Sequence, residues 1–134
     1  MEGRPEDNGF GLRIFAGSRI DAYLQRADRQ RGYTVAIWRG PHVAEPTQLS
    51  AEDATTYWLE VLRVARVLER HYRPAKLNFM TLGNALPHLR THVIPRYVDD
   101  PAPGRPLPSP TEELPPIPED EFARGVLALR ALLR

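Results

Sequence analysis

The feature that most constrains the fold is one long amphipathic helix in the middle of the chain. Apolar residues recur at helical spacing from about Ala51 to His71, and Pro74 follows, where a helix cannot continue. Ser50 is placed to cap this helix, with Asp53 three residues later in the capping-box position. The predicted apolar stripe consists of Ala54, Trp58, Val61, Leu62, Ala65, Leu68 and Tyr72. The sequence therefore predicts one long helix whose stripe packs on the rest of the domain.

Extended segments are predicted on both sides of this helix. β-Branched and aromatic residues at 33–38 indicate a buried strand. Further strands are expected at 76–82 and 88–95, separated by a turn at Gly83-Asn84. The segment 19–24 fits either a short strand or a turn of helix, and its pattern does not decide between them.

Prolines set the C-terminal part of the chain apart. Eight prolines between residues 99 and 118 exclude a regular helix or a central strand, so this stretch is expected to run extended over the surface. A short helix is predicted at 119–132 and could dock on the body or on a partner. Its apolar side carries Phe122, Val126, Leu129 and Leu133. At the other end, the polar residues 1–11 predict a flexible tail.

Composition excludes several classes of protein. The formal net charge of +1 argues against a dedicated nucleic-acid binder, which usually carries a large basic excess. The absence of cysteine excludes disulfides, thiolate metal sites and cysteine nucleophiles. No apolar run is long enough to span a membrane and the first residues do not form a signal peptide, so we expect a cytoplasmic protein.

The strand predicted at 88–95 carries an unusual polar face. Because side chains alternate along a strand, His88, Arg90 and His92 point the same way. The residues predicted to face the core are Leu89, Thr91 and Val93. Two imidazoles and a guanidinium can hold an anion such as phosphate, although an exposed edge-strand face would have the same pattern. We expect no metal. His88 and His92 are four residues apart, which suits a zinc site on a helix, but this segment is predicted to be a strand and lacks the intervening glutamate of the helical zinc motif.

The segment Asn84-Ala-Leu-Pro-His-Leu-Arg-Thr-His-Val-Ile-Pro-Arg-Tyr97 resembles the signature of the histidine-triad family, in which three histidines alternate along a strand. Surrounding segments are similar to a small bacterial branch described as diadenosine-tetraphosphate-hydrolase-like. The resemblance implies an α+β fold, with an antiparallel sheet of about five strands, one long helix packed on it and a homodimeric assembly. On this basis the family domain is expected at 12–98, followed by an extension at 99–134.

The resemblance also implies roles for individual residues. His88 and His92 match the family histidines that bind and orient phosphate, and His42 matches a further histidine that adds to the site. Asn84 matches a polar group that contacts the phosphoryl or leaving group. The implied ligand is a nucleotide or another phosphate-bearing small molecule, with no cofactor. Arg90 stands where the family has its nucleophilic histidine.

Other candidates for the ligand lie outside the triad strand. Asn78 and Arg96 are expected to bind phosphate, Arg96 from the end of the same strand. Either Gln25 or Asp28 is expected to meet a ribose hydroxyl, because the family uses an acidic or amide group in this region.

Arginine at the nucleophile position changes the chemistry that is expected. A guanidinium stays protonated and offers only donors, so Arg90 cannot form the family's covalent nucleotidyl intermediate. Loss of a nucleophile costs on the order of 10⁶ in rate. One interpretation is a nucleotide- or phosphate-binding protein without orthodox turnover. The alternative is an enzyme with altered chemistry, in which the histidines act as acid or base and Arg90 binds an anion. A third interpretation is that Arg90 was introduced and is not natural, and one sequence does not distinguish the two.

Overall fold

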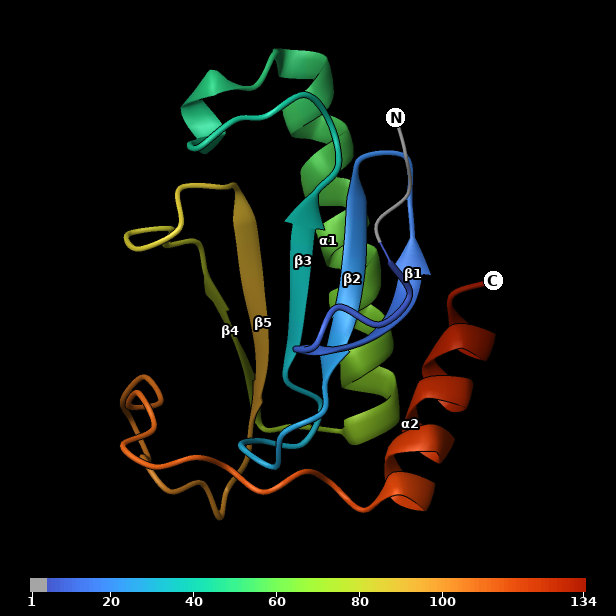
Figure 1. The fold of residues 1–134 in the computed structure, drawn as a ribbon, viewed down its shortest axis with the longest axis vertical. Coiled ribbons are helices and arrows are strands. Elements are labelled where there is room, and N and C mark those ends of the chain that lie inside the picture. The colour runs from blue at the N-terminus through green and yellow to red at the C-terminus, as the bar shows by residue number, and fades with distance from the viewer. Residues whose placement is uncertain (1–4) are drawn as a thin grey trace.

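A computed structural model describes residues 5–134 as an α+β domain built on one antiparallel sheet. The strands are β1 (Gly11–Ala16), β2 (Ile20–Gln25), β3 (Thr34–Trp38), β4 (Lys76–Met80) and β5 (Arg90–Arg96). Their order across the sheet is β1-β2-β3-β5-β4 (Figure 1). The helices are α1 (Ala51–Tyr72) and α2 (Glu119–Leu132), with a short 3-10 turn, η1 (Pro46–Gln48), before α1. The predicted fold class is confirmed.

The strands β1, β2 and β5 differ from what the sequence predicted. β1 has no counterpart among the predicted strands, because a register shift between Arg13 and Phe15 breaks the alternation that marks a strand. The undecided segment at 19–24 is the strand β2, whose residues 20–24 are all buried and therefore do not alternate. β5 begins at Arg90, so His88 lies in the preceding loop instead of in the strand.

The long helix α1 begins as predicted, but its buried face is rotated. Ser50 accepts a hydrogen bond from the Asp53 amide at 3.1 Å, as expected of a helix cap. Trp58 remains 36% exposed, whereas its neighbour Tyr57 is fully buried and its hydroxyl bonds to Thr91 Oγ1 at 2.7 Å. The buried residues of the helix are Tyr57, Val61, Val64, Ala65 and Leu68. The predicted stripe was wrong at this position, because it included Trp58 and not Tyr57. The Thr91 hydroxyl on β5 gives Tyr57 a buried partner, which helical spacing alone does not reveal.

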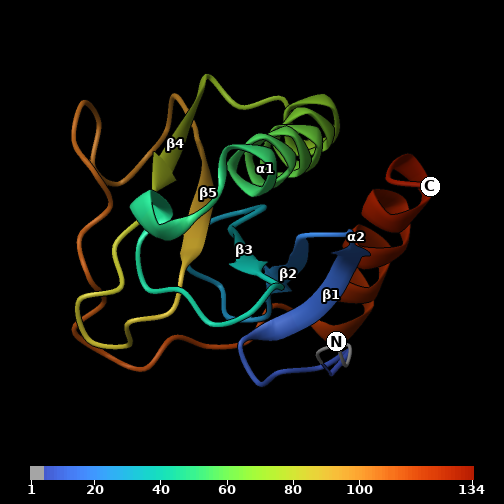
Figure 2. The same ribbon diagram turned by 90° about the horizontal axis from the view of Figure 1, so that it is seen from above.

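Both helices lie on one face of the sheet, α1 over its middle and α2 at the β1 end (Figure 2). The four apolar residues predicted to line one side of α2 are all buried. Arg130 on α2 donates to the Arg13 carbonyl at 2.7 and 2.9 Å, and Arg63 on α1 donates to the Leu133 carbonyl at 2.7 Å. The C-terminal helix therefore docks on the body of its own chain.

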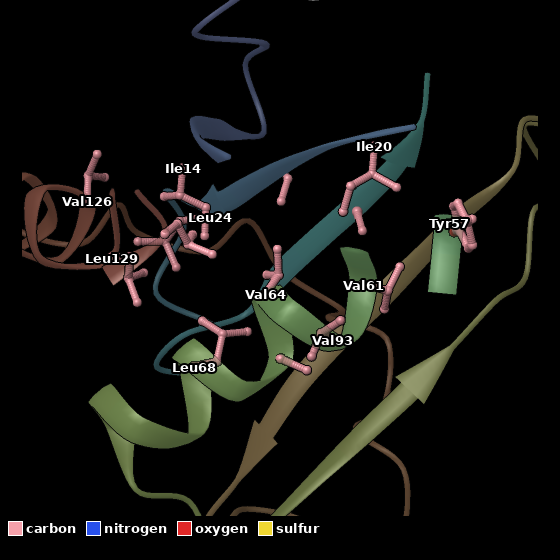
Figure 3. Packing of buried hydrophobic residues seen from close by; sticks show 14 of the residues in the cluster. Ile14, Ile20, Leu24, Tyr57, Val61, Val64, Leu68, Val93, Val126 and Leu129 are labelled. Carbon is pink, nitrogen blue, oxygen red and sulfur yellow. The ribbon is translucent and has the colours of Figure 1, made fainter. Parts of the chain in front are cut away.

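The main core lies between the two helices and the sheet (Figure 3). Each buried aliphatic side chain in it stabilises the fold by about 1.5–3 kcal/mol. The labelled members are Ile14, Ile20, Leu24, Tyr57, Val61, Val64, Leu68, Val93, Val126 and Leu129. None of the helices within residues 5–134 is long and apolar enough to cross a membrane.

A smaller apolar cluster covers the opposite face of the sheet. Leu107, from the Pro-rich segment, packs there with Tyr33 and Ile94. That segment forms neither helix nor strand between 99 and 117, apart from one isolated bridge between Pro116 and Ala27.

The N-terminal segment contacts the body of the domain over the part that the structure describes. The Arg13 amide donates to the Glu6 carbonyl at 2.8 Å, and Arg26 pairs with Asp7 at 2.9 Å. Residues 1–4 of the expected tail lie outside the described residues.

Candidate functional site

The strand β5 separates a buried face from a polar face. Thr91 and Val93 are completely buried on the side of α1, together with Leu89 just before the strand. Arg90 and His92 alternate with them and are only partly buried, on the opposite face of the sheet. The alternation places a guanidinium and an imidazole side by side on a rigid element.

His42 and His88 come together from two loops at the end of β3. The Leu89 amide donates to the Val43 carbonyl at 3.0 Å, so the two loops run beside each other. The imidazole rings of His42 and His88 stack with their centroids 5.3 Å apart, and their Nδ1 atoms are 3.1 Å apart.

The hydrogen bonds of this pair determine where its protons lie when both rings are neutral. His88 Nε2 is 3.1 Å from the Trp38 carbonyl, and a carbonyl can only accept, so His88 Nε2 carries the proton. His88 Nδ1 is then an acceptor, and His42 Nδ1 donates to it. His42 therefore carries its lone pair on Nε2, on an exposed ring. This makes His42 a hydrogen-bond acceptor or a base at the edge of the site.

Arg90 uses one nitrogen to hold the loop before its own strand. Its Nη1 donates to the Leu86 carbonyl at 2.8 Å and to the His88 carbonyl at 3.0 Å. Its Nε–H and Nη2–H groups have no protein partner among residues 5–134. These groups form the fork with which arginine binds a carboxylate or phosphate. The guanidinium is thus anchored on one side and able to bind an anion on the other.

His92 is bonded to a tyrosine of the neighbouring strand segment. The Tyr33 hydroxyl lies 2.7 Å from His92 Nδ1, and the two rings meet edge to face at a centroid distance of 5.7 Å. Burial lowers the pKa of His92, and the charges of Arg90 and Arg29 lower it further. His92 is therefore held neutral near pH 7.

A second arginine lies beside this pair. The guanidinium carbon of Arg29 is 5.2 Å from the centre of the Tyr33 ring, and its Nη2 donates to the Pro108 carbonyl at 2.6 Å. The Pro-rich segment thereby holds Arg29 close to the polar face of β5. Two arginines add positive charge around a neutral histidine, which favours an anionic ligand.

Two of the predicted phosphate ligands have other partners. Arg96 is 8% exposed, and its Nε and Nη2 atoms bond to the two carboxylate oxygens of Asp100 at 2.7 Å each. Arg96 Nη1 donates to Asn78 Oδ1 at 2.7 Å. Arg96 and Asn78 therefore join β4 and β5 to the start of the Pro-rich segment, and their contact with phosphate stays a prediction. Asn84 lies in the exposed loop before His88.

Tyr33 and Arg29 are the parts of the site that the sequence did not single out. Residues 33–38 were predicted only as a buried strand, and the hydrogen bond between the Tyr33 hydroxyl and His92 was not foreseen. The pairing of Val35 with His92 brings Tyr33 and His92 together, although they are 59 residues apart in the sequence. The one signal available in the sequence was the hydroxyl group of Tyr33, the first residue of the predicted buried strand.

Within residues 5–134, no three histidine, aspartate or glutamate side chains gather as metal ligands.

The fold and the polar strand together define a histidine-triad type of domain, and comparison with known proteins agrees. Residues 14–99 match the HIT domain, so the chain belongs to the HIT, or histidine-triad, family. No curated protein matches the chain significantly. The family fold supports binding of a nucleotide or another phosphate-bearing molecule.

Solved structures of bacterial histidine-triad proteins are similar to this chain over nearly its whole length. The protein from Bradyrhizobium japonicum has a TM-score of 0.85 and 23% identity, covering 93% of this chain and 92% of its own. The protein from Sinorhizobium meliloti has a TM-score of 0.82 and 23% identity, with coverages of 92% and 90%. The Marinobacter aquaeolei protein has a TM-score of 0.82 and 22% identity, with coverages of 92% and 89%. At these identities the likeness concerns the fold.

Proposed function

We propose that this protein binds a phosphate-bearing small molecule of the nucleotide class through Arg90 and His92, and does not hydrolyse it by the family's covalent route. The observation that carries the proposal is the anchored guanidinium of Arg90. Its Nη1 is bonded to the Leu86 and His88 carbonyls, while Nε and Nη2 have no protein partner in the described chain. A fixed fork of donors next to a neutral imidazole is suited to hold a phosphoryl group.

The same guanidinium argues against nucleophilic attack on phosphorus. Attack requires a lone pair and a group that can leave again, and an arginine side chain provides neither in its protonated form. With Arg90 in the central strand position, a covalent nucleotidyl adduct on the parent protein is not expected. Dinucleoside polyphosphates, which the resemblance suggests, are therefore proposed as ligands and not as substrates.

A buried acceptor supports a nucleotide over inorganic phosphate. Gln25 Oε1, at the end of β2, is buried without a hydrogen-bond partner among the described residues. A ribose hydroxyl could donate to it, once the neighbouring side chains move enough to admit the ligand. Asp28, the other candidate, is exposed and has no such buried acceptor. We therefore favour Gln25 for the ribose contact.

An enzyme with altered chemistry is the second candidate, and the tautomer of His42 favours it. His42 Nε2 carries a lone pair on an exposed ring, which is what a general base requires. In that case Arg90 would hold an anionic substrate while His42 accepts a proton. Turnover by the parent that is abolished by His42→Gln would support this second candidate.

Binding is tested by calorimetry with AMP, diadenosine tetraphosphate and inorganic phosphate. Arg90→Ala should weaken binding by about 10- to 100-fold, the usual worth of hydrogen bonds to a charged group. Arg66→Ala is the matched control, because Arg66 is an exposed arginine of α1 and its loss changes the net charge equally. An affinity that falls equally in both variants, or no heat with any of these ligands, would contradict the proposed function.

The missing nucleophile is tested by restoring histidine. Arg90→His should give hydrolysis of an adenosine phosphoramidate above the parent level, together with a nucleotidyl adduct in the intact mass. We expect a partial gain, because a misplacement of about 1 Å can cost about 10²-fold. Arg90→Lys is the control, since it keeps the charge and should show no adduct. An adduct on the parent, or parent turnover that Arg90→His does not improve, would refute the account.

A further inference from the structure

The contact between Tyr33 and His92 joins two strands on the polar face of the sheet. Val35 pairs with His92 across β3 and β5, and Tyr33, two residues earlier, reaches the same imidazole. Its hydroxyl is 2.7 Å from His92 Nδ1, and Tyr33 as a whole is only 2% exposed. A hydroxyl held this closely on a rigid ring can control the proton of its partner.

Only one assignment of the protons satisfies both groups. If the phenol donates to Nδ1, the Tyr33 hydrogen is paired and the imidazole proton lies on Nε2. If Nδ1–H donated instead, the phenol hydrogen would have no partner, because His92 is the one group in residues 5–134 that bonds to this hydroxyl. A buried donor without a partner is unfavourable.

The charges around the pair support the same assignment. Burial raises the pKa of Tyr33 and outweighs the opposite effect of Arg29, so the phenol keeps its proton. Burial, Arg90 and Arg29 lower the pKa of His92, so the ring is neutral. A neutral imidazole has one lone pair, and a phenol is a good donor to it.

Tyr33 is itself fixed from several sides. Its ring lies 6.2 Å from that of Phe10 and 5.2 Å from the guanidinium carbon of Arg29. Arg29 is bonded in turn to the Pro108 carbonyl at 2.6 Å. The N-terminal segment and the Pro-rich segment therefore both help to hold the hydroxyl in place.

We infer that Tyr33 is a positioning residue, which keeps His92 in the tautomer that bears its proton on Nε2. His92 then offers a ligand a neutral N–H donor and cannot accept a proton at that nitrogen. Together with the donors of Arg90, this favours a ligand oxygen that is fully deprotonated. This last consequence for the ligand rests on the proposed function, whereas the tautomer does not.

The tautomer is measured by nitrogen-15 NMR of the histidine rings. The chain has four histidines, so the spectrum of His92→Gln identifies the signals of His92. The parent should show His92 with Nδ1 unprotonated and Nε2 protonated. In Tyr33→Phe the two tautomers should mix, and the pKa of His92 should rise, because the donor that favours the neutral ring is gone.

Tyr57→Phe is the matched control. Tyr57 is also buried, and its hydroxyl also makes one 2.7 Å bond, but to Thr91 on the helix side of the sheet. This variant should leave the tautomer of His92 unchanged. A parent in which His92 carries its proton on Nδ1, or a Tyr33→Phe spectrum identical to that of the parent, would overturn the inference.

The effect on the ligand is measured with inorganic phosphate and AMP. Tyr33→Phe should weaken their binding by roughly five- to tenfold, as expected from one disordered hydrogen bond, and Tyr57→Phe should not. If the parent shows the expected tautomer but binds neither probe, the proposed function fails and the role of Tyr33 stands. If the parent binds both probes but His92 carries its proton on Nδ1, the positioning role fails and the proposed function stands.

Discussion

The ion pair between Arg96 and Asp100 allows a sharp test of how this fold is held together. Asp100 accepts two hydrogen bonds from Arg96 at 2.7 Å, one from Gln30 Nε2 at 2.9 Å and one from the Ala102 amide at 3.0 Å. Its side chain is 2% exposed and that of Arg96 is 10% exposed. Asp100→Asn removes the charge while it keeps the shape, and leaves a buried guanidinium without its counter-ion.

The expected cost follows from burial. Breaking a buried pair by changing one partner costs about 3–5 kcal/mol, because the remaining charge is uncompensated. The loop that contains Asp100 can relax toward solvent, so we expect a value near the lower limit, about 3 kcal/mol. The assay is equilibrium unfolding in urea, with the slope checked to be the same in both proteins.

A second pair of the same kind provides the control. Arg124 and Asp120 are also an arginine and an aspartate four residues apart, but their side chains are 70% and 78% exposed. Asp120→Asn should leave the free energy of unfolding essentially unchanged, because solvent screens an exposed pair. An Asp100→Asn variant as stable as Asp120→Asn would show that the buried pair is solvated and that the reasoning is wrong.

Acid should reproduce this loss in the parent. Hydrogen bonds from Arg96, which outweigh the effect of burial, hold the pKa of Asp100 well below its ordinary value. A carboxylate with a lowered folded-state pKa stabilises the protein above its unfolded pKa, near 3.9, and this stability is lost as the pH falls. The difference in unfolding free energy between the parent and Asp100→Asn should therefore be constant above about pH 5 and shrink below about pH 4.

Two further predictions concern the backbone and the assembly. Gly32 has a φ of +82°, and a Cβ there would lie 2.8 Å from the Tyr72 ring and 2.9 Å from Pro95 Cγ. Gly32→Ala should therefore destabilise the fold by about 2–3 kcal/mol, measured in the same urea assay. No loss of stability would contradict the tight turn. The family resemblance implies a homodimer, and β4 has a strand partner on one side only among the described residues. Light scattering should give twice the 15.2 kDa chain mass, and a monomer mass at micromolar concentrations would reject the dimer.

Local sequence patterns were sufficient to predict the helices, which satisfy their own backbone hydrogen bonds, and the strand whose buried and polar residues alternate regularly. α2 spans the predicted residues 119–132, and α1 begins after its predicted cap at Ser50. The alternation that buries Thr91 and Val93 also leaves Arg90 and His92 on one face. An arginine between two histidines is likewise visible in the sequence, and its guanidinium offers only hydrogen-bond donors.

Contacts between distant segments were decided only by the tertiary structure. His42 meets His88 across 46 residues, and Tyr33 meets His92 across 59, because β3 and β5 pair side by side in the sheet. The choice of Tyr57 over Trp58 for the core depended on a hydroxyl of β5. The sequence pattern shows which faces of the helices and strands are apolar. The proton positions of the histidines depend instead on which donors and acceptors the strand register brings within about 3 Å of them.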